Sequence, residues 1–317
     1  MADQPLVLVT GAGGHVGGRL FRRLATNNAL GVRPLLRQAQ PLPEWAAGSI
    51  PIIGDLRETA VRHEALRGVT TVVHLATRGF STALPPTADD LREEFGATLL
   101  LAQDAANAGV ETFVVVSSIH VFGRALAGTV SDATVPQPTT EYGKSRLAIE
   151  EGVAEVGARS GMKVTIVRMT NTFGAPALTH RSHWTLLIHD LCRQAVEHQH
   201  LTLRTNGYAY RDMMAIEDAV AVLEQIVLRN DLQAGSFVLA TSRTMQLREV
   251  AAMVSAAAKQ LLNVSPTVEV DATDTSEHQH FALESPGLRN QGILITDSRD
   301  EELRHLLQLA QNTFGSR

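Results

Sequence analysis

The chain has 317 residues and a formal net charge of −5, and 44% of its residues are hydrophobic. This length suits one large or two smaller globular domains, and the negative charge disfavours nucleic acid as a partner. The longest apolar runs have the length of strands rather than membrane spans, and residues 1–5 do not resemble a signal peptide. A single cysteine, Cys192, excludes an internal disulfide, so we expect a cytoplasmic protein with no membrane partner.

The first predicted elements are a buried strand, a glycine turn and a helix. Residues 6–9 are all apolar, which is typical of a parallel strand covered on both faces. Glycines follow at positions 11, 14 and 17, and a helical pattern of apolar residues begins at Val16. Glycines let the backbone approach a pyrophosphate, and the first N–H groups of the helix point toward it. We therefore predict a dinucleotide site here; the alternative is a glycine-rich turn without a nucleotide.

Strands and helices alternate through the rest of the first half. Strands are predicted at 32–36, 50–53, 69–75, 113–116 and 163–169, and helices around 60–66, 91–106 and 141–160. Asp89 or Asp90 is the expected N-cap of the second of these helices. This order predicts an α/β fold with a doubly wound parallel sheet, whose ligand crevice lies at the carboxyl ends of the strands. We expect residues 1–170 to form the dinucleotide-binding domain.

The regular alternation ends near residue 171. Helices are predicted around 184–195, 216–227, 250–262 and 301–314, and short strands at 201–203, 236–240 and 267–271. We predict that residues 171–317 form mainly a smaller, interleaved substrate-binding cap, and that about 213–242 rejoin the first domain.

Three local patterns fall where the crevice is expected. They are VVVSSIHVFG at 114–123, YGKSRLAIE at 142–150 and RMTNTFGAP at 168–176. With these motifs the chain resembles the extended short-chain dehydrogenase/reductase family, which contains nucleotide-sugar epimerases, dehydratases and 4-ketoreductases. The resemblance extends to about Leu247 and includes GYAYRDMMAIED at 207–218. It implies a Rossmann-type sheet, a nicotinamide cofactor and a homodimer that pairs the helices near 89–108 and 141–160.

The resemblance also implies a catalytic set of Ser118, Tyr142 and Arg146. A phenol has an ordinary pKa near ~10 and needs nearby positive charge to act as a base at neutral pH. Arg146 lies one helical turn after Tyr142 on the same face, and an oxidised nicotinamide adds further positive charge. Ser118 would hold the reacting oxygen against Tyr142. The alternative is that Ser118 merely ends a strand while Tyr142 and Arg146 lie on a solvated helix face.

Several positions depart from the family pattern. Arg146 stands where the family has lysine; it keeps the charge but cannot relay a proton, and Lys144 points to another helix face. Ile119 and His120 replace the Asp-Glu pair of the 4,6-dehydratases, so we do not expect 4,6-dehydration. His120 contacts the substrate or is a packed loop histidine. Glu94 replaces an asparagine of the family, which disfavours its usual ordered-water relay.

The end of the second predicted strand bears on the choice of cofactor. An acidic residue there would accept a hydrogen bond from the ribose 2′-hydroxyl and indicate a preference for NAD. The chain has Arg37 instead, so we expect NADP rather than NAD. The alternative is that Arg37 only faces solvent. The cofactor contacts that the resemblance implies are Gly11, Gly14, His15, Val16, Gly17, Arg37, Asp55, Leu56, Leu75, Ala76, Thr77, Tyr142 and Arg146.

The expected substrate contacts are His120, Asn171 and Arg211. A guanidinium can bind diphosphate oxygens bidentately; the alternative for Arg211 is a surface pair with Glu217. The clustered histidines do not follow a metal-ligand spacing, so we expect no metal. We expect Cys192 to be a core residue.

These features together predict a nucleotide-sugar epimerase or 4-ketoreductase that transfers a hydride between NAD(P) and a ring carbon, most simply C4. Two alternatives remain open. One is a catalytically altered NAD(P)-binding regulatory protein, and the other is a reductase of a non-nucleotide alcohol or ketone.

Overall fold

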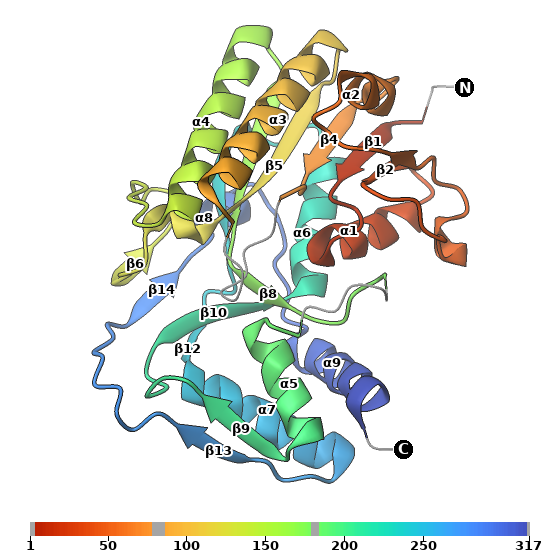
Figure 1. Cartoon of the computed structure of the whole chain (residues 1–317). Helices are drawn as coiled ribbons and strands as arrows, with labels where there is room; N and C mark the ends of the chain where they lie inside the picture. The colour runs from red at the N-terminus through yellow and green to blue at the C-terminus, as the bar shows by residue number, and fades with distance from the viewer. Residues whose placement is uncertain (1–3, 78–85, 179–183, 316–317) are drawn as a thin grey trace.

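The computed structural model describes residues 4–77, 86–178 and 184–315. Its centre is a seven-stranded sheet in which every pair of neighbouring strands is parallel (Figure 1). The strands, in sheet order, are β11 (Gly235–Leu239), β7 (Lys163–Met169), β5 (Thr112–Ser118), β4 (Thr71–His74), β1 (Leu6–Thr10), β2 (Gly31–Leu36) and β3 (Ile52–Ile53). The chain winds outward from β1 in one direction and then returns to begin again at β4. The reversal between β1 and β4 is where a doubly wound sheet forms its ligand crevice.

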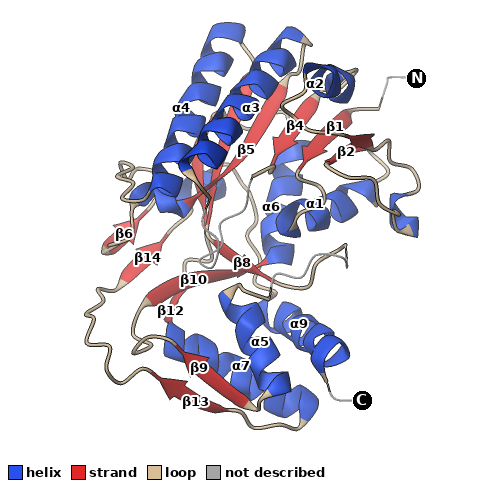
Figure 2. Ribbon diagram, in the orientation of Figure 1, coloured by secondary structure: helices blue, strands red, loops and turns tan. Residues whose placement is uncertain are grey.

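Helices cover both faces of this sheet (Figure 2). The helices are α1 (His15–Ala25), α2 (Thr59–Leu66), α3 (Ala88–Asn107), α4 (Glu141–Ser160) and α6 (Ile216–Leu228). Val7 and Val9 pack in one core cluster with α1 and α6, whereas Leu8 packs in another with α2, α3 and α4. Because successive strand residues face opposite sides, a continuous apolar strand fills both cores at once. The three layers follow directly from that pattern.

The second half forms a cap with its own apolar core. The helices α5 (Leu187–Glu197), α7 (Leu247–Leu262) and α9 (Arg299–Phe314) pack around Leu201, Leu203 and Met213. The cap strands are β8 (Asn171–Phe173), β9 (His200–Leu203), β10 (Tyr210–Ala215), β12 (Thr244–Gln246) and β13 (Thr267–Val270). Between the two halves lie β8 and β10, which pair in parallel (Figure 1). The remaining short elements are η1 (Glu44–Ala46), η2 (Ile119–Phe122), β6 (Gly128–Val130), β14 (Phe281–Leu283) and α8 (Pro286–Asn290).

Most predicted elements are confirmed, and α4 and β7 have the predicted bounds. The predicted cap of α3 is wrong: Thr87 is the N-cap, and Asp90 lies at the third helical position, where it completes a capping box. The predicted strand at 50–53 shortens to two residues. The short strands β8 and β10 were not predicted, because their pairing with each other is set by tertiary contacts. No helix in the described parts of the chain is both long and apolar enough to cross a bilayer.

Candidate active site

The glycine loop joins β1 to α1 in a tight turn. Gly14 donates its N–H to the Gly11 carbonyl at 2.8 Å, and Gly11 has a positive φ of 70°. A side chain at Gly17 would place its Cβ 2.1 Å from that same carbonyl oxygen, so the helix approaches the loop as closely as glycine allows. Gly14 brings no side chain to cap α1, and its first turn has no acid. The N-terminus of α1 therefore fits an anionic group such as a pyrophosphate.

The predicted cofactor residues gather around this loop at the strand ends. A Cβ on Gly11 would meet the backbone of Leu75 and Ala76 at 2.8 Å, and Leu75 and Ala76 both donate N–H bonds of 3.2 Å to Thr10. Thr77 follows in the same segment. On the other side of the loop, a Cβ added to Gly13 would lie 3.4 Å from the Leu36 side chain. The loop therefore lies between the carboxyl ends of β4 and β2, as a dinucleotide site requires.

The segments after β2 and β3 complete this edge. Arg37 is exposed directly after β2, and Asp55 and the buried Leu56 follow β3. A hydrogen bond from Arg57, 2.8 Å from the Asp55 carboxylate, lowers the pKa of Asp55, and Arg37 acts in the same direction. Arg37 thus presents positive charge at the place where an acid would favour NAD.

Ser118 and Tyr142 meet at the carboxyl end of β5. Ser118 is the last residue of β5 and accepts the His120 N–H at 3.3 Å, while Tyr142 opens α4 after its N-cap Thr140. Burial raises the pKa of the Tyr142 phenol, and a hydrogen bond with Ser118 acts in the opposite direction. Ser117, the neighbouring candidate, is 6% exposed and belongs to the buried part of the strand. The hydroxyl that reaches Tyr142 is therefore that of Ser118.

Arg146 is buried beneath this pair rather than solvated. Its exposed fraction is 2%, and its guanidinium carbon lies 5.5 Å from the centre of the Tyr142 ring. It forms an ion pair with Glu94 of α3. Burial acts to lower the pKa of Arg146, and Glu150 acts to raise it, so the guanidinium keeps its charge. The alternative of a solvated helix face is wrong for Arg146, while Lys144 is exposed and pairs with Glu141 at 2.8 Å.

His120 lies beside Tyr142 and interacts electrostatically with Arg124 and Arg211. The rings of His120 and Tyr142 meet edge to face with their centres 5.7 Å apart. Burial, then Arg211, then Arg124 lower the pKa of His120, and burial followed by Arg124 lowers the pKa of Arg211. The sequence did not identify Arg124; its place directly after the SSIHVFG motif is the signal that was available. The cluster favours an anionic ligand.

The two cap residues that were expected to contact a substrate come from the unpredicted strands. Asn171 begins β8 and donates to the Asp212 carbonyl at 3.3 Å, and Arg211 lies next to Asp212 in β10. The alternative pairing of Arg211 with Glu217 is wrong, since Glu217 pairs with Arg19 and Arg23. The strand pair thus brings both residues from the cap toward the sheet.

A hydrogen-bonded chain under the loop was not predicted. His74 Nδ1 lies 2.8 Å from Thr10 Oγ1, and His74 Nε2 lies 3.0 Å from Thr98 Oγ1. Thr98 donates its own proton to the Glu94 carbonyl at 2.8 Å, so His74 carries its proton on Nε2 and accepts from Thr10 on Nδ1. Burial lowers the pKa of His74 to about 3, and Arg146 acts in the same direction. A neutral His74 therefore links β1 to the helix that holds Glu94.

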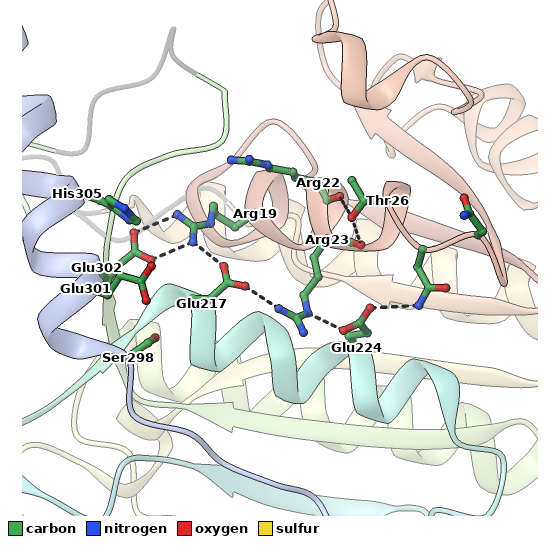
Figure 3. A pocket seen from close by; sticks show the side chains of 12 residues that line it. Arg19, Arg22, Arg23, Thr26, Glu217, Glu224, Ser298, Glu301, Glu302 and His305 are labelled. Atoms are coloured by element: carbon green, nitrogen blue, oxygen red, sulfur yellow. Dashed lines mark hydrogen bonds and ion pairs between the residues drawn. The ribbon is translucent and has the colours of Figure 1, made fainter.

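A charged groove of about 820 Å³ lies elsewhere, between α1, α6 and α9 (Figure 3). None of the predicted site residues lines it. Arg19 pairs with Glu217 at 2.5 Å and with Glu302 at 2.9 Å, and Arg23 pairs with Glu217 and Glu224 at 2.6 Å each. These charges already compensate each other, so we assign the groove to the structural link between the sheet half and α9.

The histidine-rich segments do not form a metal site in the part of the chain that the structure describes. His189 packs against His15 with ring centres 5.1 Å apart, and His200 pairs with Glu269 at 2.8 Å. His180 and His183 lie outside the described residues. Cys192 is fully buried in the apolar core of the cap, as expected.

Comparison with known proteins places this geometry in a family. The chain is 29% identical over 175 residues to a UDP-glucose 4-epimerase of Vibrio cholerae, covering 53% of this chain and 52% of the relative. It is 29% identical over 244 residues to a 2′-dehydrokanamycin reductase of Streptomyces kanamyceticus, covering 76% of this chain and 63% of the relative. The chain thus spans about half to two thirds of the length of these curated relatives.

Among solved structures, MoeE5 in complex with UDP-glucose and NAD has the same fold. The TM-score is 0.81 at 23% identity, and the alignment covers 98% of this chain and all of MoeE5. The profile of the NAD dependent epimerase/dehydratase family matches residues 7–240, from β1 to the end of β11. The chain therefore belongs to the NAD dependent epimerase/dehydratase family, within the extended short-chain dehydrogenases/reductases that its motifs resemble.

Proposed function

We propose that the protein is an NAD(P)-dependent oxidoreductase or epimerase that acts on a nucleotide sugar at a ring hydroxyl or keto carbon, most simply C4. The observation that carries this proposal is the meeting of Ser118, Tyr142 and Arg146 at the carboxyl end of β5. The glycine loop opens onto the same edge of the sheet, so a cofactor bound there lies beside a proton-transfer group.

When bound, NAD(P) would supply the hydride acceptor or donor. Gly11, Gly14 and Gly17, with the first turn of α1 at His15 and Val16, would hold its pyrophosphate. Asp55 and Leu56 would flank the adenine, and the segment Leu75, Ala76 and Thr77 would lie under the nicotinamide side. We propose this assignment for the sheet half and substrate binding for the cap.

Tyr142 would take the proton of a substrate hydroxyl or give one to a carbonyl oxygen. Ser118, already hydrogen-bonded to the phenol, would orient that oxygen against Tyr142. Arg146 would supply positive charge and, by resemblance, contact the ribose. It does so without relaying a proton, because a guanidinium does not release its proton at accessible pH.

The substrate side supports a diphosphate ligand. Arg211 would bind the diphosphate oxygens, with Asn171 and His120 as further contacts, and Arg124 adds positive charge nearby. A non-nucleotide substrate is the second candidate, and it is favoured by the likeness to the kanamycin-type reductase over 76% of this chain.

We further propose NADP as the preferred cofactor. Exposed Arg37 after β2 supports this choice, since a guanidinium there can pair with a 2′-phosphate. MoeE5 was solved with NAD, so a preference for NADP would distinguish this chain from MoeE5. The expected result is tighter binding of NADP than of NAD, which Arg37→Ala removes.

The exposed surface of α3 and the single cysteine bear on assembly and on cellular location. We propose a homodimer through α3 and α4, supported by Leu100 on α3, which is 48% exposed. Sedimentation checks this assignment: the wild type should sediment as a dimer and Leu100→Asp as a monomer.

The single cysteine supports a reducing compartment such as the cytoplasm.

The experiment begins by denaturing purified protein and identifying any released nicotinamide. The protein is then mixed with NAD or NADP and with UDP-glucose or dTDP-glucose, and reduced nicotinamide is followed by absorbance. Stoichiometric bound cofactor with sugar epimerisation identifies an epimerase, and freely exchanged cofactor with net reduction of a keto sugar identifies a reductase. Turnover of free alcohols or ketones without any nucleotide sugar would favour the second candidate. Cofactor binding without turnover would favour a regulatory protein.

A further inference from the structure

Two departures from the family pattern contact each other in the structure. Arg146, in place of lysine, forms an ion pair with Glu94, in place of asparagine. Both side chains are buried, with exposed fractions of 2% and 8% for the residues. A buried charge without a partner is strongly destabilising, so each residue makes the other tolerable. The two departures are therefore one coupled change.

The pair lies within electrostatic reach of Tyr142. The guanidinium carbon of Arg146 is 5.5 Å from the Tyr142 ring centre, and Glu94 approaches the guanidinium from α3. The α3 backbone at Glu94 is tied to β4 and β1, because the Glu94 backbone carbonyl accepts the Thr98 hydroxyl in the chain that runs through His74 to Thr10. The carboxylate therefore reaches Arg146 from a helix that is anchored to the sheet.

Ionisable and charged groups lie on α4 and on the elements around it. They are His120 after β5, Arg146 and Glu150 on α4, the exposed Glu141 and Lys144 on α4, Arg168 on β7, His74 on β4, Glu94 on α3, Arg124 after η2 and Arg211 on β10. Glu150 pairs with Arg168 at 2.8 Å in a second buried pair, so its charge is largely matched. His74 stays neutral.

We propose that Glu94 is a positioning residue, whose carboxylate holds the Arg146 guanidinium toward α3 and offsets part of the positive charge that Arg146 presents to Tyr142. The proposal rests on the acid/base role proposed above for Tyr142. A negative charge behind Arg146 favours the neutral phenol over the phenolate. A phenol that stays protonated would give its proton to a carbonyl oxygen, and reduced NAD(P), when bound, would supply the hydride for the carbonyl carbon. The pair therefore suits carbonyl reduction.

The test titrates Tyr142 in the cofactor-free protein by near-ultraviolet tyrosinate absorbance. The chain has three tyrosines, so subtracting the curve of Tyr142→Phe isolates this residue. We expect Glu94→Gln to lower the midpoint of the Tyr142 titration by about one pH unit, because removal of the carboxylate exposes more of the Arg146 charge. The matched control is Glu93→Gln, an exposed carboxylate on the same helix that pairs with Arg57 at 2.9 Å, which leaves the midpoint in place.

A purely structural Glu94 would lower thermal stability without moving this midpoint, and an unchanged midpoint overturns the proposal. If Glu94→Gln does not fold, Glu94→Asn combined with Arg146→Lys replaces the pair without leaving an unmatched carboxylate. This double variant should also titrate below the wild type, and equality with the wild type overturns the proposal.

The titration uses no substrate, so it separates this inference from the proposed function. Failure of the proposed function would appear as unchanged turnover in Tyr142→Phe, whatever the titration shows. Where both hold, the limb of the pH–rate profile that reports Tyr142 shifts in Glu94→Gln by the same amount and in the same direction as the titration.

Discussion

The sheet half and the cap contribute to the site in different ways. In the sheet half, the expected chemical groups stand at strand ends: the glycine loop follows β1, Leu75 follows β4, and Ser118 ends β5. In the cap, the three long helices build an apolar core, and the side chains that we propose for substrate binding come from β8 and β10. Positions in the sheet half are therefore fixed by a parallel sheet, and those in the cap by one short strand pair.

This difference predicts that substitutions in the two halves have different effects on the protein. Changes at the strand ends of the sheet half should alter cofactor binding or chemistry, while changes in the cap should alter substrate affinity. The halves are also joined on their outer side, where Arg19 of α1 pairs with Glu302 of α9 (Figure 3). The following substitutions test the separation.

The largest effect is expected at the glycine loop. In Gly17→Ala the new Cβ would lie 2.1 Å from the Gly11 carbonyl oxygen, so α1 must move away from the loop. We expect NAD(P) affinity to fall by up to about 150-fold, since overpacking costs up to about 3 kcal/mol. Calorimetry with both cofactors measures this. Gly13→Ala is the matched control, because its Cβ would lie 3.4 Å from Leu36, an ordinary contact. Equal losses in both variants would contradict this account of the loop.

A smaller effect is expected in the cap. Arg211→Ala should weaken binding of uridine diphosphate by about 10- to 100-fold, the range for a lost charge-assisted hydrogen bond. Affinity for NAD(P) should not change, because the cofactor residues lie in the sheet half. Arg304→Ala, an exposed arginine of α9, is the control and should affect neither ligand. A parallel loss of cofactor affinity in Arg211→Ala would break the proposed division.

The smallest effect, counted over one pH unit, concerns stability against acid. The pKa of His74 falls from 6.5 to about 3 on burial, so below pH 6.5 the unfolded chain binds a proton that the folded one does not. The free energy of unfolding should therefore fall as pH drops from 6.5 toward 3, by up to about 1.4 kcal/mol per pH unit from this residue. Denaturant titrations of His74→Gln should show a shallower pH dependence than the wild type. His63 is exposed, so His63→Gln should show the same pH dependence as the wild type. If His74→Gln also shows the wild-type pH dependence, the assignment of His74 as a buried, neutral residue is wrong.

Local signals in the sequence were sufficient for several elements and motifs of the sheet half. Apolar runs set β1 and β7, Thr140 and the following pattern set α4, and the motifs located Ser118 and Tyr142 at strand or helix ends. These features depend on neighbours along the chain. Each could therefore be predicted before the packing was known.

The rest depends on contacts between distant segments. The sequence identified Glu94 and Arg146 as two separate departures, but only the packing of α3 against α4 shows that they pair. Likewise β8 and β10 are short, and their residues form strands because they pair with each other. His74 looked like an ordinary strand end, and its role appears only when Thr10 and Thr98 lie on either side of it.

We propose that Tyr142 transfers the proton that accompanies hydride transfer at the edge of the sheet. The most direct test is a single-turnover measurement of reduced nicotinamide with UDP-glucose and saturating NAD or NADP, comparing the wild type with Tyr142→Phe. We expect the variant to bind both ligands with unchanged affinity and to react at least about 100-fold more slowly. A Tyr142→Phe variant that reacts as fast as the wild type would contradict the account.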